Sequence, residues 1–201
     1  MKKILFATGN MAKVNRFLEG LLAKNIQILT LKDIDINLNI EENGKDAIEN
    51  ALIKARAYYE KTKIPTLAMD DTLYLENVPI NKQPGMYVRR VGGKTLSDDE
   101  MISYYSALAK EYGNNGKLTA RWIYGMALIN NGEEHTYTWN KDDFYIVSTP
   151  SNIINPGYPL NTISINKKLN KYFTDMTVED KLEVKEDESD VIEFISTNIL
   201  F

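Results

Sequence analysis

The sequence predicts an α/β fold in which a mixed β-sheet is flanked by helices. Short apolar segments alternate with helical periodicity between residues 3 and 69, as strands and helices do in α/β proteins. Two strand-like segments between residues 119 and 148 then flank Asn130-Asn131-Gly132, a sequence typical of a hairpin turn. No linker or repeat interrupts the 201 residues, so residues 1–201 are expected to form one domain, large or divided into two lobes that share a cleft.

The first elements follow from periodicity. Residues 3–8 form an apolar run that predicts a strand, and Gly9-Asn10 separates it from a helix whose apolar residues recur every 3.6 positions to about Ala23. Residues 27–31 can form a second strand. A polar loop is expected over residues 33–44.

A second helix is expected after this loop. Asp46, with Glu49 three residues later, resembles a capping box, and Pro65 ends the helix. Its predicted buried stripe is Ala47, Ile48, Ala51, Leu52, Ala55 and Tyr59. The later elements are expected to be a brief strand over 66–69 that stops at Asp70-Asp71, a helix capped by Ser97, the hairpin, and a helical end from Asn170.

Composition excludes several classes of function. The chain has no cysteine and one histidine, His135, so a disulfide framework, a thiol nucleophile and a site of two imidazoles are excluded. The apolar runs are far shorter than the ~20 residues of a membrane helix, and a cleaved signal peptide is not expected after Met1. A cytoplasmic protein without membrane contact is therefore expected.

The charge is distributed unevenly along the chain. Residues 171–201 hold nine acidic and three basic side chains, which predicts a solvated acidic helix face. The other residues carry no basic stripe, so a nucleic-acid partner is not expected.

Three polar clusters lie where elements are predicted to end. Gly9-Asn10 and Lys13 stand between a strand and a helix, where free backbone N–H groups and an ammonium group can hold an anion. The second cluster is Glu41-Glu42-Asn43-Gly44 followed by Asn50 and Lys54, which are four residues apart and share a helix face. Asp70-Asp71 after an apolar strand would suit Mg²⁺, because adjacent carboxylates require neutralising cations.

Each cluster also has an ordinary structural interpretation. Gly and Asn are common in strand–helix turns, a helical lysine is commonly a surface residue, and two aspartates can form a polar turn. The clusters become informative only in combination.

The motifs occur in the order Thr8-Gly9-Asn10-x-x-Lys13, Glu42-x-Gly44-x5-Asn50-Ala51-x-x-Lys54-Ala55, Asp70-Asp71 and Pro84-Gly85-x-Tyr87-x-x-Arg90. In this order and spacing the chain resembles the inosine triphosphate pyrophosphatase family, which removes ITP, XTP and their deoxy forms. The resemblance is strong over residues 3–92 and returns at residues 172–181. It implies a two-lobed α/β fold with a long twisted mixed sheet and a central cleft, and commonly a homodimer.

The resemblance also implies roles for matching residues. Substrate-binding residues would be Thr8, Gly9, Asn10, Lys13, Lys54, Thr72, Tyr158 and Lys181. The metal, Mg²⁺, would be held by Glu42, Asp70 and Asp71. Asp71 would also accept the proton of the attacking water, and Lys54 would act in catalysis by contacting phosphate oxygens.

The departures from the family are concentrated in its base-binding part. Residues 155–159 lack the Phe and the Asp of the family's Gly-Phe-Gly-Tyr-Asp-Pro stretch, which packs on the base. Residues 182–187 lack the Ser-His-Arg whose His and Arg read the 6-oxo group of a purine. Arg16 stands where an acidic residue is usual. The expected activity is therefore Mg²⁺-dependent hydrolysis of a nucleoside triphosphate to the monophosphate and pyrophosphate, with altered or relaxed base preference.

Two other functions remain open at this point. The chain could be a non-catalytic nucleotide-binding module derived from such an enzyme. It could also hydrolyse a modified nucleotide or another phosphoanhydride with the same residues.

Overall fold

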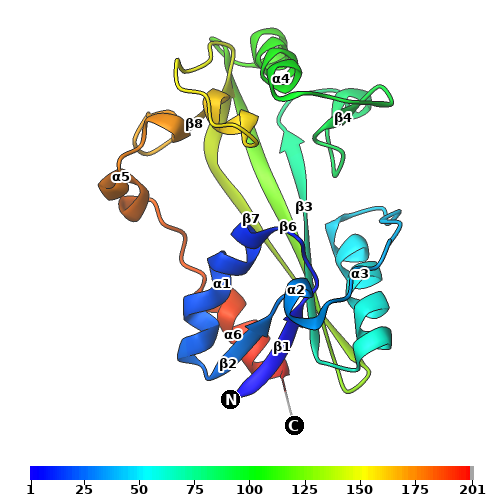
Figure 1. Ribbon diagram of the computed structural model, residues 1–201. Coiled ribbons are helices and arrows are strands. Elements are labelled where there is room, and N and C mark those ends of the chain that lie inside the picture. Colours follow the sequence, from blue (N-terminus) through cyan, green and yellow to red (C-terminus); the bar gives the residue numbers. More distant parts are fainter. Residues whose placement is uncertain (200–201) are drawn as a thin grey trace. The chain divides into compact units, whose positions relative to one another are not determined.

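The structure is a computed structural model that describes residues 1–199. Figure 1 shows its elements. The strands are β1 (Lys2–Phe6), β2 (Ile26–Leu29), β3 (Thr66–Leu75), β4 (Arg90–Val91), β5 (Lys94–Thr95), β6 (Lys117–Asn130), β7 (Glu133–Val147) and β8 (Ser164–Asn166). The α-helices are α1 (Met11–Ala23), α2 (Leu31–Ile34), α3 (Ala47–Thr62), α4 (Asp98–Tyr112), α5 (Val178–Glu183) and α6 (Ser189–Asn198), and three short 3₁₀ helices are η1 (Ile80–Lys82), η2 (Pro159–Ile163) and η3 (Phe173–Asp175).

Six strands form one sheet in the order β2-β1-β3-β6-β7-β8. Strand β1 is parallel to β2 and β3, whereas β7 is antiparallel to β8. Strands β6 and β7 are joined by Asn131 and Gly132, which both have positive φ, 51° and 83°, as a tight hairpin requires. The predicted mixed sheet with flanking helices is confirmed.

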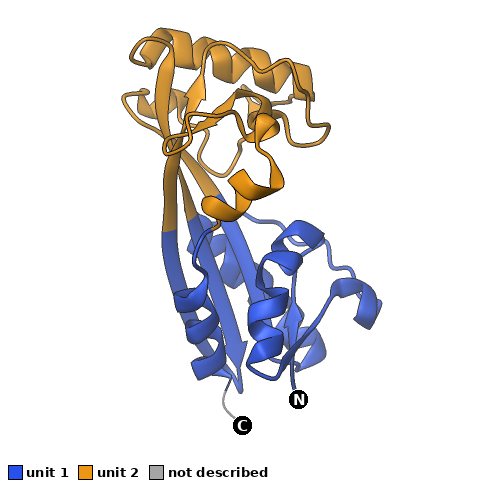
Figure 2. Cartoon of the chain, turned by 90° about the vertical axis from the view of Figure 1, so that its left-hand side faces the viewer, with its two compact units in different colours: residues 1–71, 124–139, 186–201 blue, residues 72–123, 140–185 orange. Residues whose placement is uncertain are grey.

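The chain divides into two compact units, which Figure 2 shows in different colours. Unit 1 contains residues 1–71 and 124–139 and the chain from residue 186 onward, and unit 2 contains residues 72–123 and 140–185. Strands β3, β6 and β7 each contribute residues to both units. Among the described residues, no helix is long and apolar enough to span a membrane.

Unit 1 has helices on both faces of its strands because side chains alternate along β1. Leu5 and Ala7 pack in the apolar cluster that α3 covers, whereas the Phe6 ring lies 6.2 Å from the ring of Phe17 in α1. Helix α6 packs along α1, where Gly20 leaves room for Ile192. Figure 1 shows α1 and α6 on the side of the strands opposite α3.

Unit 2 has its own core beneath α4. The predicted cap is confirmed, because Ser97 and Glu100 form a complete capping box. Tyr105 is fully buried and donates its hydroxyl hydrogen to the Val88 carbonyl at 2.7 Å. The cluster consists of Leu73, Leu75, Val78, Met101, Tyr105, Leu108, Ala109, Leu118, Ala120, Phe144, Ile146 and Ile163.

Helix α3 differs from the prediction in its buried face. Asn50 and Tyr58 are buried, whereas Leu52 and Tyr59 are only partly buried. The buried face of α3 therefore includes two side chains with polar groups that the predicted stripe left out. A polar residue is buried when it has hydrogen-bond partners, which an apolar pattern cannot reveal. The Asp46 cap is confirmed, but the Glu49 carboxylate accepts from the Lys45 N–H, so the reciprocal half of the box is absent.

Candidate phosphate and metal site

The first predicted cluster lies at the carboxyl end of β1. The Asn10 side chain caps α1 by accepting from the Ala12 N–H at 2.9 Å, and the Thr8 hydroxyl accepts from the Asn10 N–H at 3.1 Å. The predicted cap is therefore confirmed. Gly9 does not have the positive φ of a glycine-dependent turn, and a Cβ added there would meet nothing within 4 Å. The backbone at Gly9 therefore does not itself require glycine.

Asp70 and Asp71 lie inside β3, which runs six residues beyond the predicted end at Met69. The expectation that the strand stops before them is wrong. Successive side chains of a strand point to opposite faces, so the two carboxylates are separated. Asp71 forms an ion pair with Lys13 of α1, whereas Asp70 accepts from the Asn50 side chain of α3 at 2.8 Å.

Lys54 is not a surface lysine. Its side chain is only 14% exposed, and its ammonium group lies 3.0 Å from a carboxylate oxygen of Glu42. Lys13 and Lys54 thus each hold one carboxylate. An ammonium group has three N–H donors, so each lysine retains capacity to bind a further oxygen.

Asn50 connects the loop of Glu42 to strand β3. Its side-chain oxygen accepts from the Gly44 N–H at 2.8 Å while its nitrogen donates to Asp70, and only 2% of the residue is exposed. A Cβ at Gly44 would lie 2.8 Å from that oxygen, which explains the glycine there. Asn50 therefore joins the second motif to Asp70 of the third.

Asn50→Ala is expected to lower the free energy of unfolding by about 1–3 kcal/mol, since it removes a buried side chain that bonds to two half-buried partners, Gly44 and Asp70. Urea unfolding monitored by circular dichroism measures this loss. Asn81→Ala, at an exposed position in η1, is the control and should change stability by less than about 0.5 kcal/mol. Equal stability of the two variants would contradict the positioning role.

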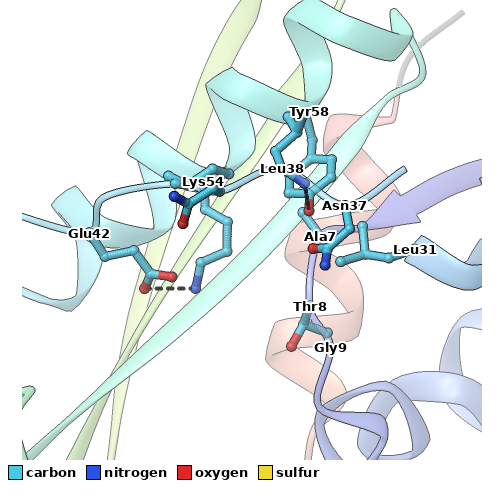
Figure 3. Close-up of a pocket in the computed structure, with 11 residues that line it drawn as sticks. Ala7, Thr8, Gly9, Leu31, Asn37, Leu38, Glu42, Lys54 and Tyr58 are labelled. Atoms are coloured by element: carbon cyan, nitrogen blue, oxygen red, sulfur yellow. Dashed lines mark hydrogen bonds and ion pairs between the residues drawn. The ribbon is translucent and has the colours of Figure 1, made fainter. Parts of the chain in front are cut away.

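Unit 1 contains a polar pocket of about 240 Å³ at the Glu42–Lys54 pair. Four predicted residues line it: Thr8, Gly9, Glu42 and Lys54. Its other lining residues are Ala7, Leu31, Asn37, Leu38, Asn39, Ile40 and Tyr58. Figure 3 shows the Glu42–Lys54 contact across the pocket from Thr8 and Gly9. The segments that follow β1 and β2 meet here, at the carboxyl ends of parallel strands, where α/β sheets bind ligands.

The donor set fits a hard cation only in part. Within residues 1–199, no three acidic or histidine side chains gather closely enough to hold a metal. Glu42 and Asp71 supply oxygen ligands, which Mg²⁺ prefers, but each is already paired with a lysine. A bound Mg²⁺ would therefore take its remaining ligands from water and from the phosphates, as is usual for this ion.

The remaining predicted residues belong to unit 2. The hydroxyl of Thr72 is buried and has no hydrogen-bond partner among the residues that the structure describes. Tyr158 is 53% exposed before η2, and Lys181 is exposed on α5. Their roles in substrate binding stay predictions.

The acidic end of the chain is not simply a solvated face. Arg16 of α1 pairs with Glu186 at 2.6 Å and with Glu188, and its guanidinium lies 4.6 Å from the Tyr124 ring centroid and 5.5 Å from that of Trp139. Burial disfavours the charge of Arg16, but the hydrogen bond to Glu188 and the nearby carboxylates outweigh it and raise the pKa. The basic residue at position 16 and the acidic residues after position 185 therefore form one contact.

Arg16→Met is expected to destabilise the fold by about 2 kcal/mol, between the values for exposed and buried ion pairs. The pair is partly buried, with side-chain exposures of 21% for Arg16 and 15% for Glu188. A double-mutant cycle with Glu188→Gln, measured by urea unfolding, should give a coupling energy of about 1–2 kcal/mol. Additive effects would show that the two side chains do not stabilise each other.

Sequence reasoning missed the lining residues Asn37 and Asn39. The available signal was the alternation of Ile36, Leu38 and Ile40 with two asparagines, which is typical of an extended segment with one buried side. The mostly polar composition of residues 33–44 predicts a loop instead of an extended segment.

Solved structures match the fold over almost the whole chain. The Staphylococcus aureus Ham1 protein has a TM-score of 0.73 at 21% identity, and the match covers 98% of this chain and 97% of that one. A HAM1 protein from Coxiella burnetii also has a TM-score of 0.73, at 23% identity, with 98% of each chain covered. The chain therefore has the same α/β fold as these two proteins.

The sequence comparisons define the family. The profile of the Ham1 family matches residues 4–188. A dITP/XTP pyrophosphatase of Leptospira interrogans is 32% identical over 136 residues, covering 68% of this chain and 66% of that protein. The dITP/XTP pyrophosphatase of Bacillus subtilis is 29% identical over 185 residues, covering 90% of this chain and 89% of that protein. The chain belongs to the Ham1 family, and the predicted relationship to the inosine triphosphate pyrophosphatases is confirmed.

Proposed function

We propose that this protein hydrolyses a nucleoside or deoxynucleoside triphosphate to the monophosphate and pyrophosphate, acting on non-standard purine nucleotides such as ITP, XTP or dITP. The observation that carries the proposal is the meeting of the Thr8-Gly9 turn and the Lys54–Glu42 pair in one pocket. The names of the relatives as dITP/XTP pyrophosphatases support the choice of substrate.

The reaction is a displacement at phosphorus. Water attacks the α-phosphorus, the bond between that phosphorus and the oxygen bridging to the β-phosphorus breaks, and pyrophosphate leaves. Asp71 accepts the proton of the water. Lys13, Lys54 and the N–H groups of the first turn of α1 stabilise the negative charge that develops on the leaving group.

The proposed cofactor is Mg²⁺, held by Glu42 and Asp71, with Asp70 close by in sequence. Lys13 and Lys54 are each already paired with one carboxylate, Asp71 and Glu42, so a polyphosphate would meet both carboxylates without an added cation. When bound, Mg²⁺ would polarise the phosphate oxygens and orient the water.

The base preference is proposed to be altered or relaxed. The sequence lacks the family's His-Arg pair after Lys181, and Arg16, which stands where an acidic residue is usual, pairs with Glu186 and Glu188. Loss of hydrogen bonds to a base typically removes a few kcal/mol of discrimination.

A substrate panel tests activity and preference together. Pyrophosphate release with Mg²⁺ is measured on ITP, XTP, dUTP and the four standard triphosphates. We expect release from several of them, with kcat/KM values within about 100-fold of one another. A strong preference for ITP and XTP over GTP would refute the relaxed base preference, while confirming the reaction.

The alternative function is a non-catalytic nucleotide-binding module, which the rewritten base-binding residues favour. Nucleotide binding without release of pyrophosphate from any member of the panel would support it. The protein is further proposed to be a cytoplasmic homodimer, and a monomeric mass in solution by light scattering would contradict the dimer.

A further inference from the structure

One wall of the unit 1 pocket is the extended segment of residues 36–40. Ile36, Leu38 and Ile40 pack against the apolar cluster of α3, and the Leu38 N–H donates to the Tyr58 hydroxyl at 3.0 Å. Figure 3 shows this bond beside Asn37. Asn37 and Asn39 alternate with these apolar residues, are exposed, and line the pocket together with Leu38 and Ile40.

The two asparagines are available as hydrogen-bond donors. Neither carboxamide has a hydrogen bond to any other residue in the described part of the chain. Each amide group carries two N–H donors. Lys54 adds an ammonium group, and the Thr8 hydroxyl, which accepts from Asn10, still has its own hydrogen to donate. These donors share the pocket with the Glu42 carboxylate, which Lys54 pairs, and they fit a ligand whose oxygens only accept, such as a phosphoryl group.

The size of the pocket limits what it can hold. Pockets for whole small-molecule ligands occupy roughly 300–1,000 Å³, whereas this one occupies about 240 Å³. It suits two linked phosphoryl groups, with the rest of a nucleotide outside the pocket.

We propose that this pocket holds the two terminal phosphoryl groups of the triphosphate, which leave together as pyrophosphate, and that Asn37 and Asn39 donate hydrogen bonds to their oxygens. This assignment rests on the proposed function and adds two positioning residues to it. A nucleoside diphosphate would fill only part of the pocket, so the two asparagines favour triphosphates over diphosphates.

The pocket wall at Gly9 has open space beside it. A methyl group at Gly9 would clash with no protein atom within 4 Å, and the backbone there does not require glycine. Gly9→Ala should therefore leave the urea midpoint unchanged and weaken pyrophosphate binding, because the methyl group takes space at the pocket wall.

The experiment is a calorimetric titration of inorganic pyrophosphate, with Mg²⁺ present, into the full chain. The wild type should bind, and Asn37→Ala/Asn39→Ala, which adds no charge, should bind at least tenfold more weakly. Asn81→Ala, the exposed control in η1, should bind within twofold of the wild type. The double variant should also lose more kcat/KM on a nucleoside triphosphate than on the diphosphate.

The outcomes separate the two proposals. Unchanged pyrophosphate binding in the double variant, with nucleotide hydrolysis intact in the wild type, overturns the role of the asparagines and leaves the proposed function standing. Weakened binding in the double variant, with no hydrolysis by the wild type, supports the pocket and refutes the function. No pyrophosphate binding by the folded wild type overturns the pocket assignment.

Discussion

Asp71→Asn is expected to lower kcat about 10³-fold, because the amide cannot accept the proton of the attacking water and is a weaker metal ligand. The fold should remain intact. The Asp71–Lys13 pair has side-chain exposures of 29% and 20%, so its loss should cost about 1 kcal/mol or less. Steady-state pyrophosphate release, together with circular dichroism, measures both effects.

Asp99→Asn is the matched control for this variant. Asp99 is exposed on α4 in unit 2, so the same chemical change should leave kcat within twofold. Full activity in Asp71→Asn would remove the proposed proton acceptor and with it the mechanism.

Lys54→Met is expected to lower kcat/KM about 10²–10³-fold, the usual effect of removing one group that stabilises developing charge. Methionine retains an apolar stem in the position of a side chain that is only 14% exposed. Glu42 is 37% exposed and can be hydrated when its partner is lost, so stability should change by about 1 kcal/mol or less.

The control lies on the same helix. Lys61 is exposed near the end of α3, and Lys61→Met should leave kcat/KM within twofold. If Lys54→Met retained wild-type kcat/KM on every nucleotide that the protein hydrolyses, Lys54 would be only the structural partner of Glu42.

The sequence predicted those parts of the fold that depend on local signals. Asn10 and Ser97 cap helices as expected, and the Asn131-Gly132 turn joins β6 to β7. Capping and turn geometry are decided by neighbouring residues, so they can be predicted from sequence.

Features that depend on tertiary partners were not predictable in this way. The polar Asp70-Asp71 pair looked like the end of a strand, but β3 continues because each carboxylate finds a partner on a helix, Asn50 or Lys13. The contact of Arg16 with Glu188 joins residues 172 positions apart in sequence. No local pattern identifies partners at such separations.

The most direct test of the account is hydrolysis of dITP in ¹⁸O-labelled water with Mg²⁺, followed by mass spectrometry of both products. Attack at the α-phosphorus predicts one labelled oxygen in the monophosphate and none in the pyrophosphate. Label in pyrophosphate or in inorganic phosphate would contradict this chemistry and the placement of the leaving group in the unit 1 pocket.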